Sequence, residues 1–241
     1  GRGSAYNEYE YIGFGITLEE GREMLDEAEQ LLVKAWTEDD VVHKGRYWDL
    51  SFPGLRPRPV QKPHPPIVRA CISEESMVAM GQAGRPVLIG VQTLDTLRHR
   101  FGRYRAALED SGLSETQVEN TLDQTWAQRG LFVCDSDQEG LEVVEAGLSR
   151  YKAHLLDARV RFNPGGAPPP PPGTPPPASE IVEHAFLAGT PATVAGKLEE
   201  LRDTGVRNML LNPNVGQIPA KQVERSLRLF GEKVLPKFKD E

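Results

Sequence analysis

Four short apolar segments, each followed by a segment with helical spacing, restrict the fold of this chain more than any other feature. The apolar segments are residues 67–73, 86–90, 130–136 and 206–216. Each is rich in Val, Ile, Leu or Phe and is bounded by Pro, Gly or Asn, as buried strands often are. Repeated strand-then-helix order favours parallel strands that are joined by right-handed crossovers and covered by helices. The sheet is then either open and doubly wound or part of a barrel.

Two capping boxes predict where helices begin away from these strands. Residues 17–20 precede an apolar stripe that runs to about Trp36, so we expect a long amphipathic helix after an opening loop at 1–14. Residues 114–117 have the same pattern and predict a helix to about Trp126.

Further helix starts directly follow the apolar segments. Ser73 and Thr93 are suited to cap helices after the first two strands, and Asp135 or Ser136 after the third. Thr190 followed by proline has the expected order of a cap and a first helical residue, and residues 218–238 predict a closing helix.

Two proline-rich stretches cannot be helical, because proline lacks the backbone donor and restricts the residue before it. Residues 43–66 read as an extended excursion that includes a short hairpin around 43–50. Residues 163–177 hold 9 of the 20 prolines and predict a polyproline or mobile segment at the surface. An inserted linker is the favoured interpretation of that segment, and a ligand for a partner's aromatic groove is the alternative.

Composition excludes several classes of function. The formal charge of −7, with Lys and Arg mixed among Asp and Glu, gives no basic stripe for nucleic acid. No apolar run approaches the roughly 20 residues of a membrane span, and no leader is recognisable, so we expect a cytoplasmic protein. Cys71 and Cys134 lack CxxC spacing and the five histidines form no HExxH pair, so no metal site is predicted and both thiols are expected to be buried.

Three stretches together resemble the bacterial luciferase-like monooxygenases, which are flavin-dependent (β/α)8-barrel enzymes that include alkanesulfonate monooxygenase and the F420-dependent reductases. They are GRGSAYNEYEYIGF at 1–14, PRPVQKPHPPIVRACISEES at 57–76, and AGTPATVAGKLEELRDTGVRNMLL at 188–211 with its continuation SLRLFGEKVLPKF. The resemblance implies an α/β chain of TIM-barrel type that holds about the C-terminal half, strands five to eight with their helices. It also implies one domain over 1–241, N-terminally incomplete, with strands one to four before Gly1 and a Pro-rich insertion at 163–178.

The resemblance further implies a flavin-dependent oxidoreductase. The expected form is a two-component monooxygenase that uses O2 and reduced FMN, supplied by a separate flavin reductase, on a small organic substrate. The alternatives are an F420-dependent oxidoreductase and a non-catalytic flavin-binding remnant of the barrel. No GxGxxG motif follows a strand, which fits an enzyme that does not hold NAD tightly. A homodimer is expected.

In such barrels, ligands bind at the carboxyl ends of the strands, so the turn after residue 72 is the first candidate site. Ser73 and Ser76 offer hydroxyls at a helix N-terminus, which suits the flavin phosphate, and Glu75 lies between them. The alternative is that Ser73 only caps its helix.

The opening segment supplies the other candidate cofactor contacts. Gly1 and Gly3 would let the backbone approach the flavin closely, and Arg2 would pair with its phosphate. The resemblance implies that the hydroxyl of Tyr6 also reaches the phosphate, and a surface aromatic is the alternative. No catalytic residue is assigned.

Overall fold

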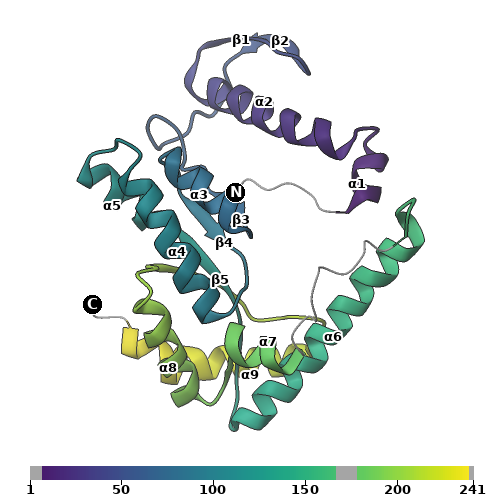
Figure 1. Ribbon diagram of the computed structural model, residues 1–241, viewed down its shortest axis with the longest axis vertical. Helices are drawn as coiled ribbons and strands as arrows, with labels where there is room; N and C mark the ends of the chain where they lie inside the picture. Colours follow the sequence, from purple (N-terminus) through teal and green to yellow (C-terminus); the bar gives the residue numbers. More distant parts are fainter. Residues whose placement is uncertain (1–6, 167–177, 239–241) are drawn as a thin grey trace. The chain divides into compact units, whose positions relative to one another are not determined.

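The computed structural model describes residues 7–166 and 178–238, which are drawn as ribbon in Figure 1. The chain divides into two compact units. The smaller unit contains the described residues up to Ile67 together with 158–166, and the larger contains Val68–Asp157 and the described residues after 177.

The smaller unit begins with a helix where the sequence predicts a loop. Helix α1, Glu8–Gly13, lies inside the opening segment, so the prediction of a loop is wrong for these residues. A six-residue helix is not stable alone. It is held by residues far away in the sequence: Arg159 Nε donates to Asn7 Oδ1 at 2.8 Å, and the Tyr9 N–H donates to Asn163 Oδ1 at 3.0 Å.

The long helix of this unit confirms the first capping box. Helix α2 spans Leu18–Thr37. The Glu20 N–H donates to Thr17 Oγ1 at 3.1 Å, and the Thr17 N–H donates to Glu20 Oε2 at 2.8 Å. Two helix-end donors are thereby satisfied reciprocally, as in other capping boxes.

The predicted hairpin is present and longer than expected. Strands β1, Asp40–Lys44, and β2, Asp49–Pro53, pair antiparallel. Their turn is closed by Glu27 of α2, whose carboxylate accepts from three successive backbone N–H groups, those of Arg46, Tyr47 and Trp48, at 2.9 to 3.1 Å. His43 Nε2 lies 3.1 Å from the same carboxylate. One side chain therefore fixes the turn.

Glu27 makes the hairpin sensitive to acid. Burial acts to raise the pKa of its carboxyl, but the N–H of Trp48, the His43 ring and the other turn N–H groups outweigh it and hold the pKa below its usual value. A lowered folded-state pKa means that this stabilisation is present above the usual pKa and is lost as the pH falls through the folded-state value. We expect Glu27→Gln to speed amide exchange at 46–48 at neutral pH and to remove the acid-dependent part of the exchange.

Glu19→Gln is the control for that measurement, since Glu19 is an exposed residue of the same helix. Hydrogen exchange read by mass spectrometry at matched pH compares the variants with the parent. Equal protection of the turn in the Glu27→Gln variant and the parent would contradict the assignment.

The larger unit is built on a parallel sheet. Its strands are β3 (Arg69–Cys71), β4 (Val87–Ile89), β5 (Trp126–Val133), β6 (Leu187–Gly189) and β7 (Asn208–Asn212). Strand β3 pairs with β4, and β5 pairs with β4, β6 and β7, always in parallel. Along β5, Trp126–Ala127 pair with β4 and Leu131–Val133 with β6, while β7 pairs with Trp126–Gly130. Strand β5 is therefore the centre of the sheet.

Helices alternate with these strands, and α3 and α4 run side by side along them (Figure 1). The helices are α3 (Glu74–Gln82), α4 (Leu94–Glu109), α5 (Glu115–Asp123), α6 (Asp137–Phe162), α7 (Ala178–Ala185), α8 (Pro191–Arg202) and α9 (Ala220–Leu229), which continues as a π-turn, Phe230–Val234, and a 3-10 turn, Leu235–Phe238. Side-chain caps at Ser73, Thr93, Ser114 and Thr190 confirm the predicted starts. Of the two candidates before α6, Ser136 accepts from the Glu139 N–H at 3.2 Å.

In the larger unit two elements were not expected, and two boundaries differ: α5 ends early, and β5 covers Trp126–Val133 where the sequence predicts a strand at 130–136. Helix α7 and strand β6 lie directly before Thr190, in a stretch for which the sequence predicts neither a helix nor a strand. Helix α5 ends at Asp123 instead of reaching Trp126, which begins β5. The reason is a long-range contact, because Asn208 Nδ2 donates to the carbonyls of Asp123 and Thr125 and so fixes the start of the strand.

The main core lies between the sheet and the helices that cover one of its faces. Ala127, Leu131 and Val133 of β5 belong to it, together with residues of α3, α4, α5 and α8. Cys71 and Cys134 are buried free thiols, as predicted, and burial raises the pKa of both. They act as small apolar residues.

Candidate functional site

The carboxyl ends of the parallel strands share one edge of the sheet in the larger unit. Four helices begin directly beyond this edge: α3 after Ser73, α4 after Thr93, α6 after Ser136 and α8 after Thr190. Their first N–H groups have no partner inside the helix and carry the positive end of the helix dipole. The edge is therefore suited to an anionic group.

The turn after β3 carries the predicted pair of hydroxyls. The Ser76 N–H donates to Ser73 Oγ at 3.2 Å, Ser73 Oγ donates to Ser76 Oγ at 3.1 Å, and Ser76 Oγ donates to the Ser73 carbonyl at 2.9 Å. All three hydrogen bonds are exposed to solvent. The structure thus brings both serines together at the N-terminus of α3 and also gives Ser73 the capping role that was the alternative.

Two glutamates share this turn. The Glu74 carboxylate pairs with His99 Nε2 at 3.0 Å and with Arg103 Nε at 3.5 Å, both from α4. These partners offset the negative charge that would repel a phosphate at the turn. Glu75 is exposed on the first turn of α3, and its role in cofactor binding stays a prediction.

Sequence reasoning missed two residues next to this turn. Arg100 of α4 donates through Nη1 to the Ile72 carbonyl at 2.6 Å and to Gln92 Oε1 at 2.9 Å, which ties the segment after β3 to the segment after β4. Gln92 Nε2 is buried and has no hydrogen-bond partner among the described residues. A buried donor without a partner is costly, so it suits an acceptor atom of a ligand. No motif surrounds Gln92, and only its place after a strand could have indicated it.

The sequence model of the luciferase-like monooxygenases matches residues 1–208. The chain belongs to this family. The match runs through segments of both compact units. Within the luciferase-like family, the parallel strands and their covering helices are part of a TIM-type barrel, and the predicted fold class is confirmed.

Curated relatives are distant but match over nearly the whole chain. An uncharacterised protein of Sinorhizobium fredii is 23% identical in an alignment 247 residues long, which covers 98% of this chain and 67% of the relative. The 2,5-diketocamphane 1,2-monooxygenase 2 of Pseudomonas putida is 21% identical over 90% of this chain and 65% of its own length. The chain therefore spans about two thirds of the length of these relatives.

Solved structures give the same fold. Monooxygenase RslO1 of Streptomyces bottropensis superposes with a TM-score of 0.69 at 23% identity, over 98% of this chain and 68% of that one. The oxygenating constituent of 3,6-diketocamphane monooxygenase of Pseudomonas putida, solved with FMN, superposes with a TM-score of 0.63 at 21% identity. The match covers 90% of this chain and 64% of that one. An F420-dependent secondary alcohol dehydrogenase, solved with an F420-acetone adduct, superposes with a TM-score of 0.62 at 14% identity. The match covers 92% of this chain and 63% of that one.

The remaining predicted contacts are not placed. Gly1, Arg2, Gly3 and Tyr6 lie outside the described residues. Among the residues that are described, no group of three or more His, Cys, Asp or Glu side chains could hold a metal ion. Nor does any described helix have the length and apolar character needed to cross a membrane.

Proposed function

We propose that this luciferase-like chain binds the phosphate of a flavin at the turn between β3 and α3 and is part of a two-component monooxygenase. The observation that carries the proposal is the pair of hydroxyls of Ser73 and Ser76, joined by a solvent-exposed hydrogen bond at a helix N-terminus on the carboxyl edge of a parallel sheet. In barrels of this type, ligands bind at that edge.

The residues present fit a phosphate group. The hydroxyls of Ser73 and Ser76 can turn from each other toward phosphate oxygens, and the first N–H groups of α3 add donors. Gln92 Nε2, which no described residue pairs with, offers a further donor at the same edge. Arg100 holds the two segments that carry these groups at a fixed spacing. A bound reduced FMN would supply the electrons with which O2 is activated toward a small organic substrate.

The nature of the cofactor is proposed from the family. The diketocamphane relatives are monooxygenases, and one solved neighbour holds FMN, which supports FMN supplied by a separate flavin reductase. An F420-dependent neighbour supports the alternative of F420. A homodimer, the small organic substrate and a cytoplasmic location stay predictions.

We expect the Ser73→Ala, Ser76→Ala double variant to bind FMN at least tenfold more weakly than the parent, since charge-assisted hydrogen bonds contribute about 1.5–3 kcal/mol each. Fluorescence titration of FMN and F420 into each variant is the measurement, and the tighter ligand decides between the two cofactors.

Ser114→Ala is the control, because the Ser114 hydroxyl also accepts from a backbone N–H three residues on and caps α5, but it does not follow a strand. Loss of either cap costs about 0.5–2 kcal/mol of stability. The midpoint of thermal unfolding is therefore expected to fall by a similar amount in both variants, while flavin affinity falls only in the double variant. If flavin affinity is the same in both, Ser73 is a helix cap and no more.

A further inference from the structure

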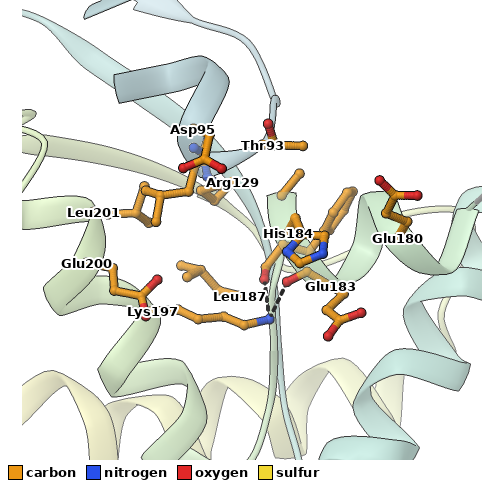
Figure 2. Close-up of a pocket in the computed structure, with 13 residues that line it drawn as sticks. Thr93, Asp95, Arg129, Glu180, Glu183, His184, Leu187, Lys197, Glu200 and Leu201 are labelled. Carbon is orange, nitrogen blue, oxygen red and sulfur yellow. Dashed lines mark hydrogen bonds between the residues drawn. The ribbon is translucent and has the colours of Figure 1, made fainter. Parts of the chain in front are cut away.

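A cavity of about 500 Å³ lies in the larger unit and is not lined by Ser73, Glu75 or Ser76 (Figure 2). It lies among the start of α4, the middle of β5, helix α7 with the residues before β6, and helix α8. The lining residues are Thr93, Leu94, Asp95, Arg129, Glu180, Glu183, His184, Ala185, Phe186, Leu187, Lys197, Glu200 and Leu201. This volume is within the range of small-molecule sites.

The cavity contains a buried guanidinium that the fold does not use fully. Arg129 is 2% exposed and lies between the part of β5 that pairs with β4 and the part that pairs with β6. Its Nη1 donates to the Gln128 carbonyl at 2.8 Å, but its Nη2 is buried without a partner among the described residues. A buried arginine normally pairs with an anion, and a guanidinium favours carboxylate.

The acidic residues of the cavity do not fill that role. Asp95 binds Arg98 Nη1 at 3.0 Å, and its side chain is 93% exposed. Glu180, Glu183 and Glu200 are exposed residues of α7 and α8, and their carboxylates lie apart from Arg129 in Figure 2.

The second cation of the cavity is already occupied. Lys197 donates through Nζ to the carbonyls of Glu183 at 2.8 Å and Phe186 at 3.1 Å, drawn as dashed lines in Figure 2. These bonds hold the end of α7. The lining therefore has four carboxylates against two cationic side chains. Of these lining residues, Arg129 alone has a buried donor without a partner in the described part of the chain. A simple anion would be repelled by such a lining, whereas a ligand with a cationic group as well would not.

We propose that this cavity binds a small zwitterion that has a carboxylate at one end, an apolar middle and an ammonium at the other. The carboxylate accepts from Arg129 Nη2, the apolar middle packs on Phe186, Leu187 and Leu201, and the ammonium lies among the exposed glutamates of α7 and α8. The site is separate from the turn proposed for the flavin phosphate and does not depend on that proposal.

Isothermal titration of the full chain with 4-aminobutanoate and 6-aminohexanoate tests the proposal, with hexanoate and hexylammonium as matched probes that each lack one charge. At least one of the amino acids is expected to bind tenfold or more tightly than both single-charge probes. Arg129→Met is expected to abolish this preference, and Arg129→Lys to weaken it.

A Glu180→Gln, Glu200→Gln double variant tests the ammonium end of the ligand independently of the carboxylate end. It is expected to reduce binding of the amino acid toward that of hexanoate, and because both side chains are exposed it keeps the test informative if Arg129→Met does not fold. The Ser73→Ala, Ser76→Ala variant should leave the titration unchanged. Equal binding of hexanoate and the amino acids, an undiminished preference in the Arg129 variants, or no binding of any probe would each overturn the proposal.

Discussion

Replacing Gly216 with alanine is expected to destabilise the larger unit by roughly 3–5 kcal/mol, the range of severe single substitutions. Gly216 has φ +68°, a conformation that side chains rarely adopt. A Cβ there would also overlap the carbonyl of Gly147 in α6 and lie 2.8 Å from its Cα. Backbone cannot move aside as a side chain can. The segment after β7 would have to leave α6, and the bond from Arg150 Nε to the Gly216 carbonyl, 2.9 Å, would be lost with it.

Urea or thermal unfolding measures this effect, and Gly102→Ala is its control. Gly102 is exposed within α4, and nothing lies within 4 Å of the added Cβ. Alanine there should raise stability by about 0.5–1 kcal/mol, because glycine costs entropy inside a helix. If Gly216→Ala behaves like Gly102→Ala, the close approach of the two backbones does not exist.

Arg129→Met is expected to raise the stability of the larger unit by about 1–4 kcal/mol. Burial lowers the pKa of Arg129 to about 10, so the group stays charged at pH 7, and no carboxylate among the described residues pairs with its buried Nη2. A decrease of this size corresponds to roughly 3 kcal/mol of unfavourable burial. Methionine has a similar stem without the charge, and apolar replacement of buried charges is often stabilising. Thermal unfolding without added ligand is the measurement.

Arg207→Met tests whether any loss of an arginine has that effect. Arg207 is 42% exposed and pairs with Glu119 and Asp123 at the surface. Its replacement should lower stability slightly or leave it unchanged, since exposed pairs contribute about 0–1 kcal/mol. A loss of stability above 1 kcal/mol in Arg129→Met would mean that the guanidinium has a partner in the folded protein. If Arg129 lowers the stability of the folded protein as expected, a role in ligand binding explains why the residue is present.

The local signals of this chain were sufficient for most of its regular elements. Strands at 69–71 and 87–89 and the caps at Ser73 and Thr93 follow from short-range patterns, since a strand end and a cap are properties of neighbouring residues. Helix α1 and the start of β5 could not be predicted this way. Both depend on side chains more than 80 residues away, Asn163 and Asn208.

The residues of the candidate sites also divide into those that local patterns predict and those that only the fold reveals. The turn at Ser73 is local and was predicted, whereas Gln92 and Arg100 become important only when two segments after different strands lie side by side. Arg129 gave no signal either. In the sequence it is a single basic residue within a strand, and only the fold shows that its side chain is buried among the residues before β6.

Strand β5 takes part in three of the four pairings of the parallel sheet. Losing it would leave only the short pairing of β3 with β4, too little to persist in water. Strands β4, β6 and β7 are therefore joined into one sheet only through β5, so any partly assembled form of the sheet with more than two strands must include β5.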